Sequence, residues 1–126
     1  MLLCDGSIQE AGTNKLTLLG LFGNWSSATF PVTFPPFRLY ARVTDMNGNY
    51  VFRIDVVELE TDTRIATLAM PSMNSADPLQ CFDITLIWPM ITFQRPGRYE
   101  FQLHANDEFI GRTTANVHLL TEAPAQ

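Results

Sequence analysis

The chain has 126 residues, of which 46% are apolar and 17% are charged, and its formal net charge is −5. This length suits a single domain with a core of its own, and the composition excludes an extended disordered chain. Nucleic-acid-binding proteins hold phosphates with clustered cations. The chain has one lysine, Lys15, and scattered arginines, so we expect no nucleic-acid partner.

The sequence also bears on membranes and compartment. No stretch approaches the roughly 18 consecutive apolar residues of a membrane span, and Cys4 and Asp5 follow Met1 too closely for an apolar signal region. We therefore expect no membrane partner and a cytoplasmic location. There Cys4 and Cys81 would be reduced and buried thiols, whereas in a secreted protein they would be candidates for a disulfide.

Apolar and polar residues alternate with a period of two in short runs, and no helical period is sustained for three turns. This pattern predicts an all-β protein, an antiparallel two-sheet sandwich of immunoglobulin-like or Greek-key type. We expect one domain over residues 1–120 and a frayed tail over residues 121–126. The eight expected strands are Leu2–Gln9, Leu16–Phe22, Phe37–Asp45, Tyr50–Glu60, Arg64–Met70, Gln80–Ile87, Arg98–Ala105 and Phe109–Leu120.

The first two strands form an expected hairpin with its turn at residues 11–14. Its second strand, Leu16–Phe22, is apolar on both faces, which is typical of a central strand in a covered sheet or of a strand against a partner. Residues 23–36 carry aromatics and consecutive prolines. We expect them to form an ordered loop or a crossover between sheets, and we expect residues 71–78 to form a polar loop.

The dipeptide Asn47-Gly48 predicts a third turn. Asn-Gly is a strong signal for a type I′ hairpin turn, because both central residues need positive φ. Such a turn sets the register of the flanking strands, and a bulge or strand end is expected near Glu58. The facing pairs on the core side would be Val43 with Phe52, Ala41 with Ile54 and Leu39 with Val56.

The other face of this hairpin would place Arg42 directly opposite Arg53, with Tyr40 and Asp55 beside them. Two cations in that position repel each other mildly. The face is therefore either a solvated surface with a small ion-pair network or an anion or partner site built from Tyr40, Arg42 and Arg53.

A final hairpin follows Pro96-Gly97, with a loop of two or three residues around 106–108. Tyr99, close behind the Pro-Gly turn, is similar to the tyrosine corner of Greek-key sandwiches, in which the hydroxyl bonds to the backbone.

Signatures of catalysis and cofactor binding are missing. The two histidines, His104 and His118, lie at polar positions of neighbouring strands, where we expect surface side chains. The sequence has no CxxC, HExxH, P-loop, GxGxxG or GxSxG motif. We expect no catalytic residue, no metal and no cofactor.

The pieces Cys4-Asp5, Lys15–Phe22, Phe30-Pro31 and Arg95–Gly111 together resemble an uncharacterised bacterial family of small β-sandwich domains. The matching residues are turn and core positions. The resemblance implies the fold and no assigned activity, so no site residue carries over.

Our first functional hypothesis is a non-catalytic cytoplasmic module for protein interaction or assembly, with a protein partner or a second copy. The second is a small-molecule or carbohydrate binder in which Trp25 or Trp88 stacks beside Arg42 or Arg53; an enzyme is a remote third. Each aromatic candidate could instead fill the core. The partner-binding candidates are Trp25, Phe30, Phe34, Trp88, Leu19 and Leu21.

Overall fold

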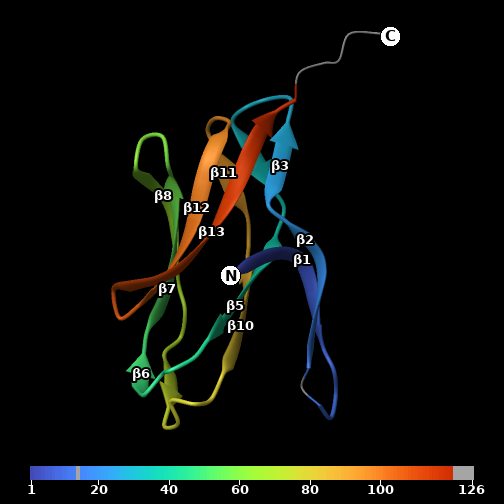
Figure 1. The fold of residues 1–126 in the computed structure, drawn as a ribbon. Helices are drawn as coiled ribbons and strands as arrows, with labels where there is room; N and C mark the ends of the chain where they lie inside the picture. The colour runs from blue at the N-terminus through green and yellow to red at the C-terminus, as the bar shows by residue number, and fades with distance from the viewer. Residues whose placement is uncertain (14, 121–126) are drawn as a thin grey trace.

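The computed structural model describes residues 1–13 and 15–120, and this part of the chain is all β (Figure 1). None of its residues forms a helix long and apolar enough to cross a membrane. The described strands are β1 Leu2–Gln9, β2 Leu16–Phe22, β3 Asn24–Ser27, β4 Val32–Phe34, β5 Phe37–Val43, β6 Gly48–Tyr50, β7 Phe52–Glu58, β8 Thr63–Ala69, β9 Met73–Ser75, β10 Phe82–Trp88, β11 Ile91–Phe93, β12 Gly97–Ala105 and β13 Glu108–Leu119.

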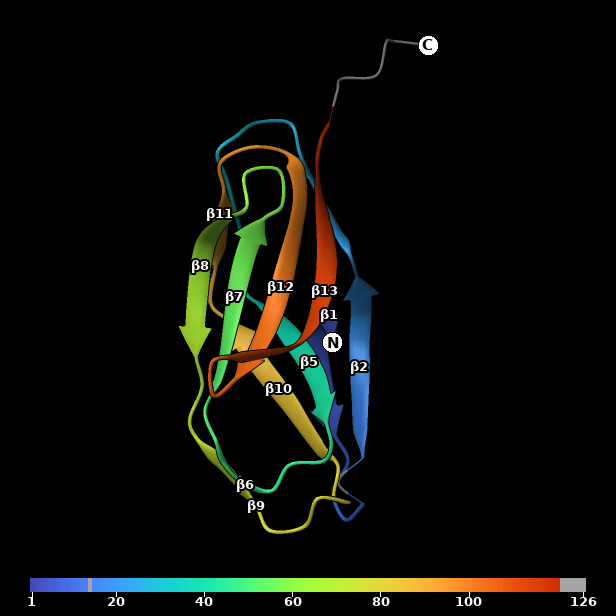
Figure 2. The same ribbon diagram turned by 60° about the vertical axis from the view of Figure 1, so that its left-hand side comes forward.

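Two larger sheets organise these strands (Figure 2). One has the order β10-β5-β1-β2 and the other the order β3-β13-β12-β7-β8. The short pairs β4–β11 and β6–β9 lie outside them. Within the described residues every pairing is antiparallel except that of β3 with β13.

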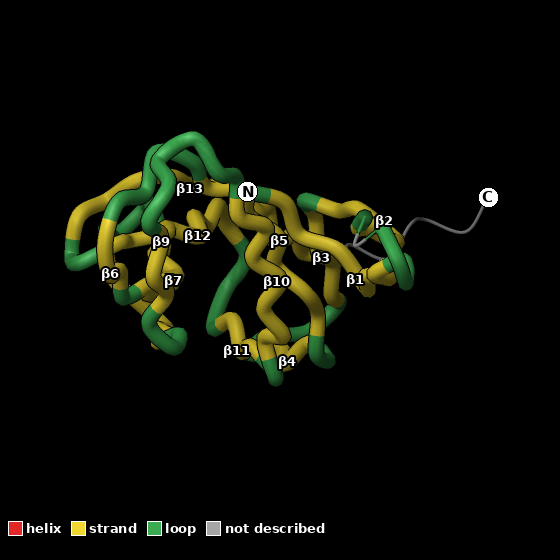
Figure 3. Tube along the Cα trace, turned by 90° about the horizontal axis from the view of Figure 1, so that it is seen from below, coloured by secondary structure: helices red, strands yellow, loops and turns green. Residues whose placement is uncertain are grey.

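The two larger sheets share one core. In the end-on view of Figure 3, β7 and β12 of one sheet lie apart from β5 and β10 of the other. β5 and β7 supply alternate apolar residues, because successive side chains of a strand point to opposite faces. Burying these side chains is the main term that stabilises the domain. The largest fully buried side chains are Tyr99, Phe52, Phe93, Phe101, Leu3, Leu39, Ile54, Val56 and Cys4.

The eight expected strands are all present, and the expected and observed bounds of β1 and β2 are identical. The expected segment 50–60 divides into the end of β6 and β7, which stops at Glu58 next to a register shift at Val56/Val57. The strands that were not predicted, β3, β4, β6, β9 and β11, have three or four residues each, too few for alternation to identify them.

The hairpin predicted at Asn47-Gly48 is wrong. Gly48 has a φ of 106°, but Asn47 is not among the residues with positive φ, so no type I′ turn forms there. β5 pairs with β10 and β1, whereas β7 pairs with β12 and β8. The chain between β5 and β7 therefore crosses from one sheet to the other. Arg42 and Arg53 do not face each other, although the six core-facing residues of the predicted pairs are all buried.

The final hairpin resolves the choice of loop length. Ala105 pairs with Glu108, and Asn106 and Asp107 have φ values of 51° and 66°, so the loop has two residues with the positive φ of a type I′ turn. A register shift at Leu103/His104 precedes this loop. Tyr99 behaves as the tyrosine corner predicts, since its hydroxyl donates to the Arg95 carbonyl oxygen at 2.6 Å.

Strand β2 lies at an edge of its sheet rather than at the centre. After Gly23 the chain enters β3, which pairs with β13 of the other sheet, so residues 23–36 include the expected crossover. Residue 14 of the predicted turn at residues 11–14 lies outside the described part of the chain. So do residues 121–126, which the predicted tail covers.

Candidate functional site

The proposed polar site is divided between the two sheets. Tyr40 and Arg42 of β5 converge on Asp83 of β10, because Asp83 is the register partner of Arg42. The Tyr40 hydroxyl donates to Asp83 Oδ1 at 2.6 Å, and Arg42 Nε donates to the same oxygen at 2.8 Å. These hydrogen bonds, first from Arg42 and then from Tyr40, hold the pKa of Asp83 below its ordinary value. Asp83 thus neutralises the cation on which an anion site would depend.

Arg53 belongs to a different cluster, on the outer face of the five-stranded sheet. Its guanidinium donates to Asp55 Oδ1 at 3.1 Å and to Asp107 Oδ1 at 2.5 Å. Asp55 is 5% exposed and also accepts the Thr67 hydroxyl at 2.6 Å. His104, expected at the surface, is mostly buried here, and its Nε2 lies 3.5 Å from Asp55 Oδ2. Asp55 is therefore held by structural partners.

The four aromatic candidates lie in or against the core. Trp88 is 4% exposed, so its ring has no free face for a partner. Trp25 is half-buried and stacks on Phe34, with ring centroids 5.4 Å apart. Phe30 is also half-buried and packs against the core cluster. These contacts favour core filling for the aromatic candidates and leave the stacking platform of the carbohydrate hypothesis without an open ring.

The two leucine candidates have the opposite environment. Leu19 is 45% exposed and Leu21 is 59% exposed on edge strand β2. Leu19 lies across from Gly6 of β1, which has no side chain to cover it. They form an apolar edge that the described part of the molecule leaves open.

A tightly bonded carboxylate lies where β7 ends. Glu58 is 4% exposed and accepts hydrogen bonds from Arg95 Nε at 2.7 Å and Arg95 Nη2 at 2.8 Å. The hydroxyl groups of Thr61 and Tyr99 donate to it at 2.7 Å and 3.1 Å. These partners, Arg95 foremost, lower the pKa of Glu58 to about 2. Burial, followed by the neighbouring carboxylate, raises the pKa of Tyr99 to about 12.

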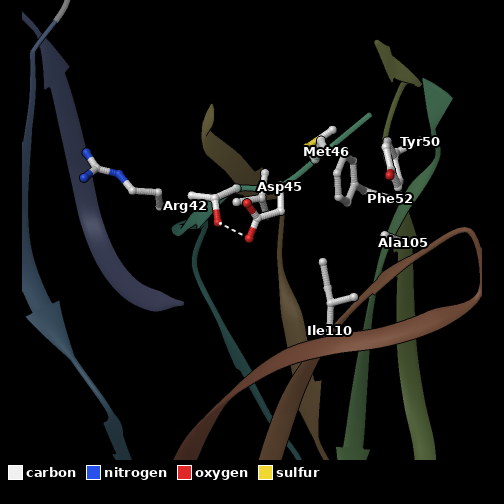
Figure 4. A pocket seen from close by; sticks show the side chains of 9 residues that line it. Arg42, Asp45, Met46, Tyr50, Phe52, Ala105 and Ile110 are labelled. Carbon is white, nitrogen blue, oxygen red and sulfur yellow. Dashed lines mark hydrogen bonds between the residues drawn. The ribbon is translucent and has the colours of Figure 1, made fainter. Parts of the chain in front are cut away.

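A hollow of about 330 Å³ lies at the other end of β7 from Glu58, beside the last residues of β5 and β12 (Figure 4). Its lining combines apolar side chains with polar ones, and Thr44 and Asp45 lie at one side. In Figure 4 the Arg42 side chain points away from the other labelled side chains and toward the β1–β2 hairpin. The lining residues are Arg42, Val43, Thr44, Asp45, Met46, Tyr50, Phe52, Ala105 and Ile110.

Within residues 1–13 and 15–120, no three side chains of His, Cys, Asp or Glu gather closely enough to hold a metal ion. Both cysteines are free thiols. Cys4 is buried as expected, but Cys81 is exposed, which corrects the expectation that it is buried.

The sequence reasoning missed Asp83 and Asp45. Asp83 meets Arg42 because β10 pairs with β5, a contact between segments about forty residues apart that no local pattern encodes. Asp45 had a weak signal: it follows a strand in a run of turn-forming residues and has a φ of 60°. The hollow beside it requires the β12–β13 hairpin and could not be inferred locally.

Comparisons with known proteins place the chain in a family without adding an activity. No curated protein and no solved structure matches it. The expectation of an uncharacterised family of small proteins is confirmed: the family of unknown function DUF6941 matches residues 1–118, and the chain belongs to it.

Proposed function

We propose that this protein is a non-catalytic cytoplasmic assembly module that pairs with a second copy of itself through edge strand β2. The single observation that carries the proposal is an open, uncharged, apolar sheet edge. Such an edge presents unpaired backbone groups to another strand, and soluble proteins usually protect it with charges, prolines or a covering segment.

The edge strands of the described sheets differ in this respect. β2 has seven residues, LTLLGLF, and none of them is charged. β10 and β8, the edges beside β5 and β7, carry Asp83 and Arg64, and β3 has only four residues. β2 is therefore the long edge with the least protection.

A second copy fits this edge because association about a two-fold axis is self-complementary. Antiparallel pairing of β2 with β2 of another copy places apolar side chains opposite apolar side chains. Lys15 precedes β2, so the two copies' lysines would lie at opposite ends of the paired strands. Addition of a strand at an edge supplies backbone hydrogen bonds as well as buried apolar area.

The state of Glu58 supports a non-catalytic role for this carboxylate. A general acid needs a pKa near the working pH, whereas Glu58 is held ionised by Arg95 and two hydroxyl groups. The exposed free thiol of Cys81 favours a reducing compartment, because disulfides form in oxidising ones.

As part of this proposal, the two larger sheets and the tyrosine corner are those of an immunoglobulin-like sandwich.

Size-exclusion chromatography with light scattering tests the proposal. The wild-type chain is expected to have the mass of a dimer, and Leu21→Lys is expected to shift it to the monomer. Ile87→Lys is the matched control, since Ile87 is 54% exposed on the opposite edge strand, β10, and this variant should remain a dimer. A wild-type chain that is monomeric at every concentration, or equal effects of both lysines, would overturn the proposal.

A further inference from the structure

The hollow between the end of β5 and the β12–β13 hairpin has the properties of a preformed site. Its walls include Val43, Met46, Phe52 and Ala105, each 8% exposed or less. These residues also belong to the core cluster, so core packing holds this part of the wall in place. Preformed apolar hollows with a few polar groups are the usual form of small-molecule sites.

An exposed apolar rim extends these walls outward. The Tyr50 ring stacks on Phe52 with centroids 6.3 Å apart and an interplanar angle of 23°, and it remains partly exposed. Ile110 of β13 is 46% exposed and lies across from the aromatic pair in Figure 4. An apolar ligand body seated there would cover surface that is now in contact with water, which is favourable.

The charge of the hollow is negative. Asp45 lies at its side, and the hydrogen bond that the structure gives its carboxylate comes from the Thr44 hydroxyl at 3.4 Å. The guanidinium of Arg42 does not offset this charge, because Asp83 and Tyr40 hold it on the other side of β5. The Asp45 backbone is itself anchored, since its N–H donates to the Pro78 carbonyl oxygen at 3.0 Å.

The volume limits the size of the occupant. A water molecule takes about 30 Å³ of the liquid, so a hollow of about 330 Å³ has room for about ten non-hydrogen atoms. A carboxylate at one side and apolar walls at the other suit a ligand with one cationic end and one apolar end.

We propose that this hollow binds a small amphiphilic amine, with its ammonium group on Asp45 and its apolar body between the exposed surfaces of Tyr50 and Ile110. The site lies apart from edge strand β2 and does not depend on the assembly proposed above. It also differs from the stacking site expected from the sequence, which used Trp25 or Trp88.

Titration of the full chain with three matched probes, followed by two-dimensional amide NMR, tests this proposal. The probes are phenethylamine, 2-phenylethanol and phenylacetate, which share a phenyl ring and differ in the charge of the other end. We expect phenethylamine to bind most tightly and phenylacetate most weakly. The shifted amides should lie in residues 43–52 and 105–110.

The variant Asp45→Asn separates the charge from the shape. Asparagine tolerates the left-handed backbone conformation of Asp45, so this variant should fold. It should weaken the binding of phenethylamine about 1.5- to fivefold, the range of an exposed ion pair, and leave the binding of 2-phenylethanol unchanged. Asp62→Asn is the matched control, since Asp62 also has a positive φ of 52° but lies outside the hollow.

The proposal would be overturned by equal affinity for the three probes, by amide shifts that map elsewhere, or by the same loss of amine binding in Asp45→Asn and Asp62→Asn. Absence of any shift with phenethylamine near its solubility limit would do so as well.

Discussion

The carboxylates near the two ends of strand β12 differ in burial and in hydrogen bonding. Where β12 begins, Tyr99 and Arg95 surround Glu58, which is buried and accepts four hydrogen bonds. Where β12 ends, Asp45 lies exposed beside a hollow, with Thr44 as its neighbour. A carboxylate whose hydrogen-bonding capacity is used by the fold contributes to stability. A carboxylate left at the side of a hollow is available to a ligand.

The largest expected effect on this comparison is a pH dependence at the Glu58 end. The folded pKa of about 2 lies below the ordinary value of 4.5, so the stabilisation is complete above pH 4.5 and is lost as the pH falls toward 2. Between these pH values we expect the unfolding free energy of wild type to fall by about 2 to 3 kcal/mol more than that of Glu58→Gln. This figure is smaller than the pKa difference alone implies, because solvent screens the exposed Arg95.

Urea unfolding at several pH values measures this difference. Parallel pH profiles for wild type and Glu58→Gln would show that Glu58 is not held as an ion, and the contrast between the two ends would disappear.

A tyrosine at each end gives the next largest effect. The Tyr99 hydroxyl is buried, and its single hydrogen is shared between Arg95 O at 2.6 Å and Glu58 Oε2 at 3.1 Å, so Tyr99→Phe should lower the free energy of unfolding by about 1 to 2 kcal/mol. Tyr50→Phe is the matched control at the hollow, where the hydroxyl contacts the exposed Asn47 backbone, and should cost less than about 0.5 kcal/mol. Thermal or urea unfolding compares them, and similar losses would contradict the comparison.

Asn106 tests how the hollow end is held together. Its Oδ1 accepts the Val51 N–H at 2.9 Å, and its φ of 51° suits asparagine better than alanine. Asn106→Ala should therefore lower the unfolding free energy by about 1 kcal/mol. The control Asn74→Ala changes an exposed residue of β9 and should have little effect. Equal urea midpoints for Asn106→Ala and wild type would show that this turn does not anchor the connection at residues 49–51.

The smallest effect is expected for Asp45→Asn. Asp45 is exposed and has one side-chain hydrogen bond in the described structure. The unfolding free energy of the Asp45→Asn variant should therefore stay within about 0.5 kcal/mol of the wild-type value. Urea unfolding at neutral pH beside Glu58→Gln gives the direct comparison. A loss as large as that of Glu58→Gln would mean that Asp45 is also a structural carboxylate.

Two Asn-containing dipeptides show how far local signals reach. Asn106-Asp107 forms the tight two-residue turn because β13 pairs with β12 from one end of β12 to the other. Asn47-Gly48 has the stronger turn sequence, yet Gly48 begins β6 and pairs with Ser75 of β9. The strands beside it are held by other partners, and that tertiary pairing overrides the preference of a dipeptide.

Only part of the candidate sites was predictable from the sequence. The apolar character of both faces of β2 was visible in its sequence, but its exposure was not, because that depends on the edge position of the strand in the sheet. The meeting of Arg42 with Asp83, and the hollow between Asp45 and Ile110, were not predictable, because each joins strands that are distant in the chain.

The sequence by itself determined that the protein is all β, where most long strands run and which side chains of β5 and β7 face the core. These properties follow from the period-two alternation of a strand, which is local. Only the tertiary structure decided that Val43 and Phe52 belong to different sheets, that β2 is an edge, and that the two ends of β12 differ. A core-facing side chain has the same alternation whether its neighbour lies beside it in one sheet or across the core in the other.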